Sequence, residues 1–443
     1  MILHHPGPHA SALRALATFR RTGRLRPGER RTIRLYRWRA ADQTLAIPRG
    51  LLPAVRQLTP LTVRDERVRR PAPGWQFRGQ LHDYQRQVVD AIVAQDGGII
   101  VALPGAGKTA MAYAAAAIWD QPTLWLTHTL TLAAQARADA TRWLGLPRAA
   151  IGFVGDERTD WQPLTIAMLQ TLAGKPALVR RAARLFGTVI VDECHHLPAN
   201  SFQRVAAALP AAHLLGMSAT PEREDGLGPM LTALVGPRVA VPTWVLVSRD
   251  RVLLPTVLLV PTRFRGPAGA NWAQLEKARA EDPERNRLLC EWIWRLWAGQ
   301  RRVLVLVERT VHAQRLQRAL AAAGVPARAI MGDTPASDRD RGFGEVVAGT
   351  AVGIATKIVN EGTNLPRVDA LVLGAASRAQ TRTIQQVGRV MRTAAGKTGA
   401  VVVDLIDDQA EGYRGQVAAR VGHYRALGCR LQRYQGGTDH GHR

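Results

Sequence analysis

The sequence predicts an α/β protein of two consecutive lobes, each built on a parallel sheet. Short apolar runs recur along the chain, and most are followed by a longer segment rich in Ala, Leu and Arg at helical spacing. Parallel strands are buried on both faces and therefore read as near-continuous apolar runs. A chain of 443 residues is also longer than a single hydrophobic core usually supports, so two or three domains are expected. The runs lie at 97–103, 123–127, 164–169, 188–193 and 213–219 in the first lobe, and at 303–307, 351–356, 369–374 and 400–405 in the second.

Four segments follow from this pattern. Residues 1–78 form a basic N-terminal region with the turn-rich RRPAPGW near its end, and residues 79–240 form the first lobe. Residues 241–410 hold a linker and the second lobe, with the linker placed in PTWVLVSRDRVLLPTVLLVPT. Residues 411–443 are a C-terminal extension, whose last part, LQRYQGGTDHGHR, has the composition of a frayed tail.

The charge balance indicates a polyanionic partner. Lys+Arg number 60 against 35 Asp+Glu, which gives a formal net charge of +25. Residues 1–80 contain 17 arginines, no lysine and 4 acids, so +13 of that charge lies in the opening segment. An arginine-rich genome would explain the choice of Arg over Lys but not the shortage of acids, and nucleic acid is the common polyanion. The segment also carries Phe19, Tyr36, Trp38 and Trp75 interleaved with its arginines, so we expect it to grip DNA. Its stretch YRWRAADQTLAIPRGLL could also form a small folded domain docked on the first lobe.

Other features favour a soluble protein of the cytoplasm, associated with the nucleoid, and exclude a membrane partner. No apolar run approaches the roughly 18–20 residues of a membrane helix. The first residues lack a charged region followed by an apolar one, as a secretory signal would have. The three cysteines Cys194, Cys290 and Cys429 are too widely separated for a disulfide framework.

A phosphate-binding loop is predicted in GGIIVALPGAGKTAMAYAAAAI, which supplies strand, glycine loop and helix in that order. Glycines let successive backbone N–H groups turn toward phosphates, a lysine reaches the β- and γ-phosphates, and a hydroxyl binds Mg²⁺. Ala102 stands where the pattern usually has its first glycine. The candidate nucleotide-binding residues are Pro104, Gly105, Ala106, Gly107, Lys108 and Thr109.

The stretch VIVDECHHLPANSF permits two interpretations. Asp192, Glu193, Cys194, His195 and His196 all have side chains that ligate metals, but the chain has no CxxC or HxxxH companion for a zinc site. The pair Asp192-Glu193 instead ends a buried strand of the same sheet as the phosphate loop. There Asp192 would hold Mg²⁺ and Glu193 would polarise the attacking water. The ATPase interpretation is therefore favoured over zinc.

The second lobe has strands but no phosphate loop, so we expect it to contribute arginines. The segment IQQVGRVMR contains Gln385, Gly388, Arg389 and Arg392. Arginines three apart lie on one face of a helix, where they could stabilise charge on a γ-phosphate. The hypothesis is that ATP and Mg²⁺ bind between the lobes and that these arginines complete the site on closure.

Taken together, the motifs of residues 79–410 resemble those of superfamily 2 helicases of the DEAD/DEAH type, in the order of that family. LHDYQ resembles the adenine-reading Q motif, LPGAGKT the Walker A motif and DECH the Walker B motif. LTHTLTLAAQ and TIAMLQTL are similar to strand-contacting motifs, MSAT to the coupling motif, and ATKIVNEGTNLP and QQVGRVMR to motifs V and VI. The resemblance implies two RecA-like lobes and a nucleic-acid-stimulated ATPase that uses ATP and Mg²⁺. It adds Gln85 and Gly362 to the nucleotide site, and Thr127, His128, His195, Ser218, Ala219, Thr220 and Thr356 to coupling and nucleic-acid binding.

A finer resemblance, carried by DECHHLPA and ATPEREDGL, is to the XPB-like branch, which acts on duplex DNA. Arg223, Glu224 and Asp225 match its RED motif, implicated there in strand opening, whereas Asn364 stands where many relatives have Asp. Phage helicases and type III restriction translocase subunits are similar as well. The resemblance implies a monomeric ATP-dependent DNA helicase or translocase that acts on double-stranded or forked DNA, with a nuclease or repair protein as a candidate partner.

Three alternatives stay open: an ATPase subunit of a restriction or defence nuclease, an RNA helicase, and a nucleic-acid-binding module with a vestigial ATPase. Against a nuclease, the leftover segments contain no cluster of acids and lysine for a two-metal cutting centre. Against a vestigial ATPase, Lys108, Asp192, Glu193 and Arg392 are intact.

The tryptophan-rich LLCEWIWRLWAGQRR suggests either a base-stacking platform or core packing. Trp294 and Trp297 share a helical face with Cys290 and Ile293, directly before a strand, so we expect them to pack on the second sheet.

Overall fold

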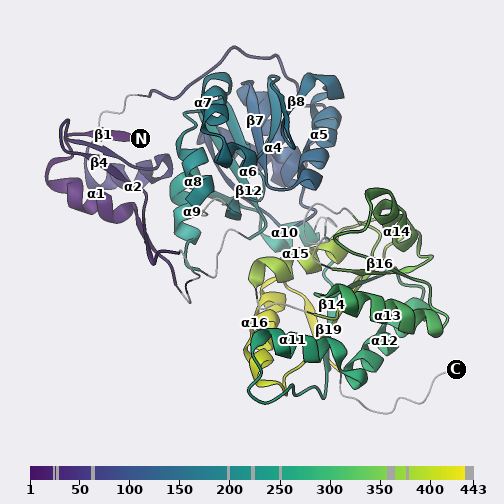
Figure 1. Cartoon of the computed structure of the whole chain (residues 1–443). Coiled ribbons are helices and arrows are strands. Elements are labelled where there is room, and N and C mark those ends of the chain that lie inside the picture. The colour runs from purple at the N-terminus through teal and green to yellow at the C-terminus, as the bar shows by residue number, and fades with distance from the viewer. Residues whose placement is uncertain are drawn as a thin grey trace. The chain divides into compact units, whose positions relative to one another are not determined.

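A computed structural model describes residues 1–22, 25, 29–60, 65–196, 200–220, 225–248, 252–356, 365–375 and 379–434. The chain divides into two compact units, residues 1–103 with 107–242 and residues 104–106 with 243–443 (Figure 1). Each unit is built on a mainly parallel sheet, which confirms the predicted α/β class. No helix in the described ranges has the length and apolar character needed to cross a membrane.

The start of the basic N-terminal region folds as a small domain. Strands β1 (Ile2–His4), β5 (Thr44–Ala46) and β4 (Arg37–Arg39) form an antiparallel sheet. The same domain contains helices α1 (Ala10–Leu16) and α2 (Leu52–Leu58) and the 3-10 turns η1 (Gly7–His9) and η2 (Arg49–Leu51) (Figure 1). The core of this domain contains Leu3, Leu13, Leu45 and Val55. The stretch YRWRAADQTLAIPRGLL therefore forms part of a small folded domain, and the expected contact with nucleic acid stays a prediction.

A two-stranded ribbon, β2 (Thr18–Arg20) paired antiparallel with β3 (Thr32–Arg34), lies between these elements in the chain. Ile33 belongs to the hydrophobic core of the first lobe, and Phe19 and Leu35 pack against that core. The ribbon is thus part of the first lobe, although it precedes the predicted start of the lobe by many residues.

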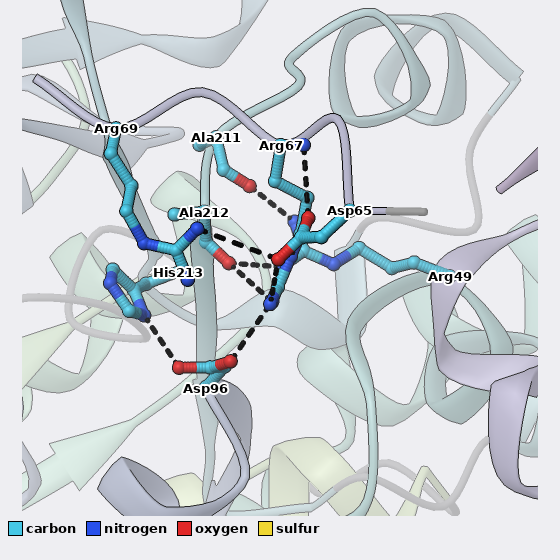
Figure 2. Close-up of polar contacts among 8 residues, drawn as sticks. All are labelled: Arg49, Asp65, Arg67, Arg69, Asp96, Ala211, Ala212 and His213. Atoms are coloured by element: carbon cyan, nitrogen blue, oxygen red, sulfur yellow. Dashed lines mark hydrogen bonds and ion pairs between the residues drawn. The ribbon is translucent and has the colours of Figure 1, made fainter. Parts of the chain in front are cut away.

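Figure 2 shows the polar cluster that joins the N-terminal region to the first lobe. Arg49 donates hydrogen bonds to the carbonyl oxygens of Ala211 and Ala212 at 2.7 and 2.6 Å. Val68 lies beside the same segment in a parallel bridge with Ala211. Burial, together with the neighbouring Arg67, lowers the pKa of Arg49 to about 10. A buried guanidinium that caps two backbone carbonyls is a structural element of the fold.

Arg67 makes the second half of this cluster. It forms ion pairs of 2.8 Å with Asp65 and with Asp96, and it donates to the carbonyl oxygen of Ala212 at 2.9 Å (Figure 2). Ala212 directly precedes β12 (His213–Ser218), and Asp96 directly precedes β6 (Gly97–Val101). The N-terminal region is therefore attached at the amino ends of these strands, the edge opposite to the one where the phosphate loop begins.

The sheet of the first lobe has the order β13-β6-β12-β11-β7-β10-β8-β9 in the described residues, parallel except for the edge strand β9. Each predicted run forms a strand: β6, β7 (Thr123–Thr127), β10 (Leu164–Met168), β11 (Thr188–Val191) and β12. Three strands were not predicted: β8 (Ile151–Gly155), which lies between β10 and β9, and the edge strands β9 (Arg158–Asp160) and β13 (Arg238–Ala240). The helical elements are α3 (Asp83–Ala94), α4 (Lys108–Trp119), α5 (Leu130–Leu144), η3 (Arg148–Ala150), α6 (Leu169–Gly174), α7 (Pro176–Leu185), η4 (Cys194–His196), α8 (Asn200–Ala207) and α9 (Gly228–Val235). The next helix, α10 (Thr243–Ser248), belongs to the second unit.

The second sheet has the order β16-β17-β15-β18-β19-β14-β20 in the described residues, and all its pairings are parallel. The four predicted runs form β15 (Val303–Leu306), β17 (Val352–Ala355), β18 (Ala370–Leu373) and β19 (Val401–Ile406). The helices are α11 (Trp272–Glu281), α12 (Pro283–Ala298), α13 (Thr310–Ala322), α14 (Ala336–Ala348), α15 (Gln380–Met391) and α16 (Glu411–Ala426). Strand β16 (Ala327–Ile330) is an edge strand that the sequence did not reveal.

Two predictions about the second lobe are wrong. The linker contains β14 (Thr256–Pro261), which lies inside the sheet between β19 and β20. The supposed tail begins with β20 (Arg430–Arg433), and the following Tyr434 ring packs edge-on against Trp292 with centroids 5.1 Å apart. Both segments owe their place to strand partners far away in the chain, such as Leu258 opposite Val403. Local composition carries no signal of such pairing.

The tryptophans of α12 divide between core and surface. Trp292 is buried and Trp297 packs against the second-lobe core, whereas Trp294 is 52% exposed. Core packing is thus confirmed for Trp297, and the expectation for Trp294 is wrong because the buried stripe of this helix runs through Leu289, Trp292 and Ile293.

Candidate active site

The phosphate loop connects β6 to α4, as the sequence predicts. Gly105 and Gly107 have φ angles of 92° and 80°, in the left-handed region that favours glycine. Lys108 is the first residue of α4, and its ammonium group donates to the carbonyl oxygen of Ala102 at 2.8 Å. The loop therefore combines a helix N-terminus with a lysine on the same turn, which is the donor set that a polyphosphate requires.

Gln85 lies against this loop. It is buried in the first turn of α3, where its side-chain oxygen accepts a hydrogen bond from the backbone N–H of His82 at 3.0 Å. A Cβ atom added to Gly107 would overlap the side-chain amide nitrogen of Gln85. The residue predicted from the Q motif is thus brought to the phosphate loop, and glycine at 107 is required for both its φ angle and its contact.

Two carboxylates follow β11 at the carboxyl edge of the same sheet. The backbone N–H of Asp192 donates to Leu126 at the end of β7, and Oδ1 of Asp192 accepts from the N–H of Glu193 at 3.0 Å. Glu193 has a φ of 46°, a left-handed conformation that turns the chain directly after the strand. Burial, reinforced by Glu193 and opposed by Lys108, raises the pKa of Asp192 to about 7. A half-buried carboxylate with a raised pKa is stabilised in its charged form by a bound cation.

His195 connects these carboxylates to β12. Its Nδ1 lies 3.3 Å from Oε2 of Glu193 and 3.2 Å from Oγ of Ser218, the last residue of β12. Ser218 Oγ in turn accepts from the backbone N–H of Thr220 at 3.0 Å. The predicted coupling residues therefore form a continuous polar path, Glu193–His195–Ser218–Thr220, and Ala219 lies within it. The path joins Glu193 to the segment after β12 through polar contacts.

A second path leads toward β7 and β10. The rings of His195 and His196 have centroids 4.3 Å apart, and those of His196 and His128 are 4.2 Å apart. The side-chain amide of Gln170, at the start of α6, donates to the carbonyl oxygen of His128 at 2.8 Å. Gln170 was expected only as part of the TIAMLQTL motif, and His196 only among the candidate ligands of the zinc interpretation. Contacts between rings from separate loops have no local sequence signal.

Cys194 and Thr127 have structural surroundings. Cys194 is fully buried, and burial raises the pKa of its thiol far above the ordinary range. Its sulfur lies so close to Gly216 of β12 that a Cβ atom there would be 2.8 Å away. Thr127 is buried at the end of β7, with its hydroxyl 3.6 Å from the sulfur of Met168. Cys194 therefore acts as a core residue and not as a nucleophile.

The predicted residues of the second lobe lie on two elements. Gln385 and the buried Arg389 are on α15, and the buried Thr356 follows β17. Helix α15 ends at Met391, and Arg392 has extended φ and ψ angles of −67° and 136°. The prediction that Arg389 and Arg392 share a helical face is therefore wrong. Gly362, Asn364, Arg223 and Glu224 lie outside the described residues.

Lys397 is a residue that the sequence analysis missed. Its ammonium group donates to the carbonyl oxygens of Val390 and Arg392 at 2.8 Å each, and to those of Val368 at 2.7 Å and Pro366 at 3.2 Å. Burial lowers its pKa to about 8. This lysine fixes the chain at the end of α15 and so positions Arg392. The sequence around it, AAGKTG, predicts only a turn.

Comparisons with known proteins identify the family of the chain. Residues 78–223 match the family model described as type III restriction enzyme, res subunit, and residues 284–394 match the helicase conserved C-terminal domain. The chain is 30% identical over 338 residues to probable helicase D10 of Escherichia phage T5, an alignment that covers 75% of this chain and 72% of the relative. It is 28% identical over 368 residues to DNA 3'-5' helicase XPB of Mycobacterium tuberculosis, covering 79% of this chain and 65% of the relative.

Among solved structures, the DNA-bound ATP-dependent Type ISP restriction-modification enzyme LlaBIII is similar in fold, with a TM-score of 0.61 and 15% identity over 82% of this chain and 32% of that one. This match supports two RecA-like lobes and nothing finer. The sequence relatives and the two family models carry the assignment. The chain belongs to the superfamily 2 helicases, in the group that contains the XPB helicases and their phage relatives.

Proposed function

We propose that this chain is an ATP-dependent DNA helicase or translocase that uses Mg²⁺ and moves along or opens duplex DNA. One observation carries the proposal: Lys108, Asp192 and Glu193 lie at one edge of the first sheet, and a polar path leads from Glu193 to Ser218 and Thr220. A phosphate site alone would suit any ATPase. A path from the hydrolytic carboxylate to another segment suits an enzyme that converts hydrolysis into movement.

The residues fit a Mg²⁺-bound nucleoside triphosphate. The glycine loop and the start of α4 suit the phosphates, and the half-buried Asp192, with its raised pKa, suits a divalent cation. The bound nucleotide supplies the phosphoanhydride whose cleavage drives movement. In this proposal Lys108 neutralises phosphate charge, Thr109 and Asp192 hold the cation, and Glu193 orients water and accepts its proton.

In the second lobe, Arg389 and Arg392 are the candidates to stabilise charge on the γ-phosphate, and Gln385 the candidate to orient water. Lys397 positions Arg392 through its backbone carbonyl. Removal of this lysine side chain is expected to lower ATP turnover without weakening ATP binding, because Lys397 does not belong to the first lobe's phosphate loop.

The decisive experiment measures steady-state ATP hydrolysis without nucleic acid and with duplex DNA, single-stranded DNA, forked DNA and RNA. Strong stimulation by duplex or forked DNA, abolished in Glu193→Gln, is the expected result. Stimulation by RNA alone would contradict the assignment to DNA. Equal turnover with and without every nucleic acid would contradict the helicase function itself.

A translocase subunit of a restriction or defence nuclease is the second candidate. The match of residues 78–223 to the res subunit of type III restriction enzymes favours it. Such a subunit would show the same DNA-stimulated hydrolysis but would act with a nuclease. Incubation of the purified chain with plasmid DNA and Mg²⁺ tests whether the chain cuts by itself, and affinity purification from its native host tests for a nuclease partner.

A further inference from the structure

The arginines of the N-terminal region fall into two groups. Arg49 and Arg67 have structural roles: Arg49 binds backbone carbonyls of the first lobe, and Arg67 forms an ion pair with Asp96 of that lobe (Figure 2). A second group surrounds the β2–β3 ribbon and is exposed: Arg20, Arg30, Arg31 and Arg34. In the described part of the chain, these four guanidinium groups make no hydrogen bond or ion pair. Their charge is not used to hold the protein together.

The register of the ribbon separates its two faces. Phe19 pairs with Ile33, and this apolar pair faces the first-lobe core. Side chains alternate along a strand, so Arg20 and Arg34 point to the opposite face. They stand on different strands, Arg20 opposite Thr32 and Arg34 opposite Thr18, as diagonal neighbours roughly 7–8 Å apart. Two guanidinium groups at that spacing can contact separate phosphates of one nucleic-acid strand.

The ribbon is held firmly in place. Arg21 forms an ion pair of 2.6 Å with Glu29 and one of 3.6 Å with Asp225. The backbone N–H of Thr22 donates to the carbonyl oxygen of Asp225 at 2.8 Å. A Cβ atom on Gly226 would lie 2.9 Å from the hydroxyl of Thr22, so the two segments are in close contact. A rigid base lets exposed cations bind without first ordering their own backbone.

The position of this anchor links the ribbon to the coupling path. Asp225 is the last residue of the RED motif, and it stands five residues after Thr220 in the chain. Asp225 is thus engaged by the N-terminal region. The ribbon and the segment after β12 belong to one structural unit.

We propose that the outer face of the β2–β3 ribbon, with Arg20 and Arg34, and the exposed Arg30 and Arg31 that precede β3, form a contact surface for the phosphate backbone of duplex DNA. The proposal rests on the proposed function and adds a surface to it. Contacts to phosphates are independent of base sequence and depend strongly on salt, because each one releases condensed counterions. The ribbon therefore strengthens the hold of the first lobe on DNA while ATP hydrolysis occurs elsewhere in the chain.

The test compares two variants that lose equal charge. Arg20→Ala/Arg34→Ala removes the two arginines whose direction follows from the strand register. Arg180→Ala/Arg184→Ala removes two exposed arginines from α7 and serves as the matched control. Affinity for a duplex oligonucleotide is measured by fluorescence anisotropy at several salt concentrations, and thermal unfolding verifies that both variants are folded.

For the ribbon variant we expect the slope of log K against log salt to become shallower by about 1.8, since each phosphate contact in B-DNA contributes about 0.9. Replacement of all four arginines is expected to change the slope by up to about 3.6. ATP hydrolysis without DNA should be unchanged. An unaltered slope in the ribbon variants, or an equal change in the α7 control, would overturn the proposal. Equal loss for duplex RNA would identify a general phosphate surface and overturn the assignment to DNA.

The proposed function is judged separately by wild-type ATP hydrolysis with and without DNA. Wild-type protein that binds DNA with a ribbon-dependent salt slope, but shows no stimulation of hydrolysis, would leave the surface intact and remove the helicase function. Stimulated hydrolysis in the wild-type protein, with unaltered DNA binding in the ribbon variants, would support the helicase function and overturn the proposed surface.

Discussion

Both lobes place carboxylates at strands in the middle of a parallel sheet, half-buried in the first lobe and buried in the second, and the two sets differ in their partners. In the first lobe, Asp192 follows β11, and its pKa is raised to about 7 by burial and by Glu193. In the second lobe, Asp407 follows β19, and the guanidinium of Arg285, 2.8 Å away, keeps the pKa of Asp407 below its ordinary value against the effect of burial.

Asp404, within β19, follows the second pattern. Arg420 donates to both of its oxygens, at 2.9 and 3.1 Å, and the Tyr424 hydroxyl donates at 2.9 Å. A buried acid that meets a matching arginine holds the fold together. An acid that lies beside a second carboxylate is not neutralised by a neighbouring cation of the protein. Its charge is therefore available to bind a metal ion or to take part in catalysis. The difference distinguishes the sheet that carries the proposed catalytic residues from one whose acids are paired with arginines, in lobes of the same architecture.

The largest expected effect is on chemistry in the first lobe. Glu193→Gln keeps the size of the side chain but removes its ability to accept a proton. We expect ATP turnover to fall about 10³-fold, roughly 4 kcal/mol in activation free energy, with little change in ATP affinity or melting temperature. A single-turnover hydrolysis assay and a nucleotide-binding titration measure both quantities. Turnover within a few-fold of wild type would show that Glu193 is not the base.

The second effect concerns stability in the other lobe. Arg285→Met leaves Asp407 buried without its main counter-charge, and we expect the free energy of unfolding to fall by about 3 kcal/mol. The exposed Arg287 lies on the same helix, so Arg287→Met is the matched control with no expected loss. Chemical denaturation compares the two variants. The double variant Arg285→Met/Asp407→Asn should regain part of the loss, and failure to do so would argue against the ion pair as the cause.

Acid is expected to weaken both lobes through buried histidines. Burial, helped by Arg67 and Arg69, lowers the pKa of His213 to about 4, and burial with Arg285 and Arg279 lowers that of His312 to about 3. The unfolded chain binds a proton near pH 6.5 whereas the folded protein does not. Stability is therefore full above pH 6.5 and falls as the pH decreases toward 4, by up to about 2 kcal/mol per histidine at pH 5.

Unfolding titrations at pH 7 and pH 5 measure this loss, and His213→Asn and His312→Asn serve as variants. Each substitution should make the free energy of unfolding less dependent on pH. A dependence identical to that of wild type in both variants would assign the acid sensitivity to other groups.

The smallest expected effect is that of a glycine replacement in the phosphate loop. A comparison of two glycines distinguishes the strain of a left-handed backbone from the clash of an added methyl group. Gly107 and Gly324 have similar φ angles, 80° and 76°, but a Cβ atom at 107 would meet Gln85, whereas one at 324 meets nothing within 4 Å. Both alanine variants should lose about 1 kcal/mol of stability. Only Gly107→Ala should weaken nucleotide binding, by roughly tenfold, because Gln85 must move. Equal nucleotide affinity in both variants would show that the contact with Gln85 has no role.

Much of the site could be predicted from the sequence because its chemistry lies in short contiguous segments. The loop before Lys108 and the pair Asp192-Glu193 follow apolar runs whose length and composition already indicate buried parallel strands. Carboxyl ends of parallel strands meet at one edge of a sheet, so these residues had to lie on the same side. The roles of Lys397, His196 and Gln170 could not be found this way, because their contacts join loops with no shared pattern.

By itself, the sequence determined the α/β class, the nine strand runs that carry it, and the residue types of the phosphate loop and the carboxylate pair. The tertiary structure alone decided that β14 and β20 belong to the second sheet. Strand β14 pairs with β19 and with β20, and both partners lie more than a hundred residues further along the chain. It also decided which acids are structural and which N-terminal arginines remain exposed. Charge and desolvation depend on the neighbours that folding brings within a few ångströms, and neither composition nor local spacing specifies those neighbours.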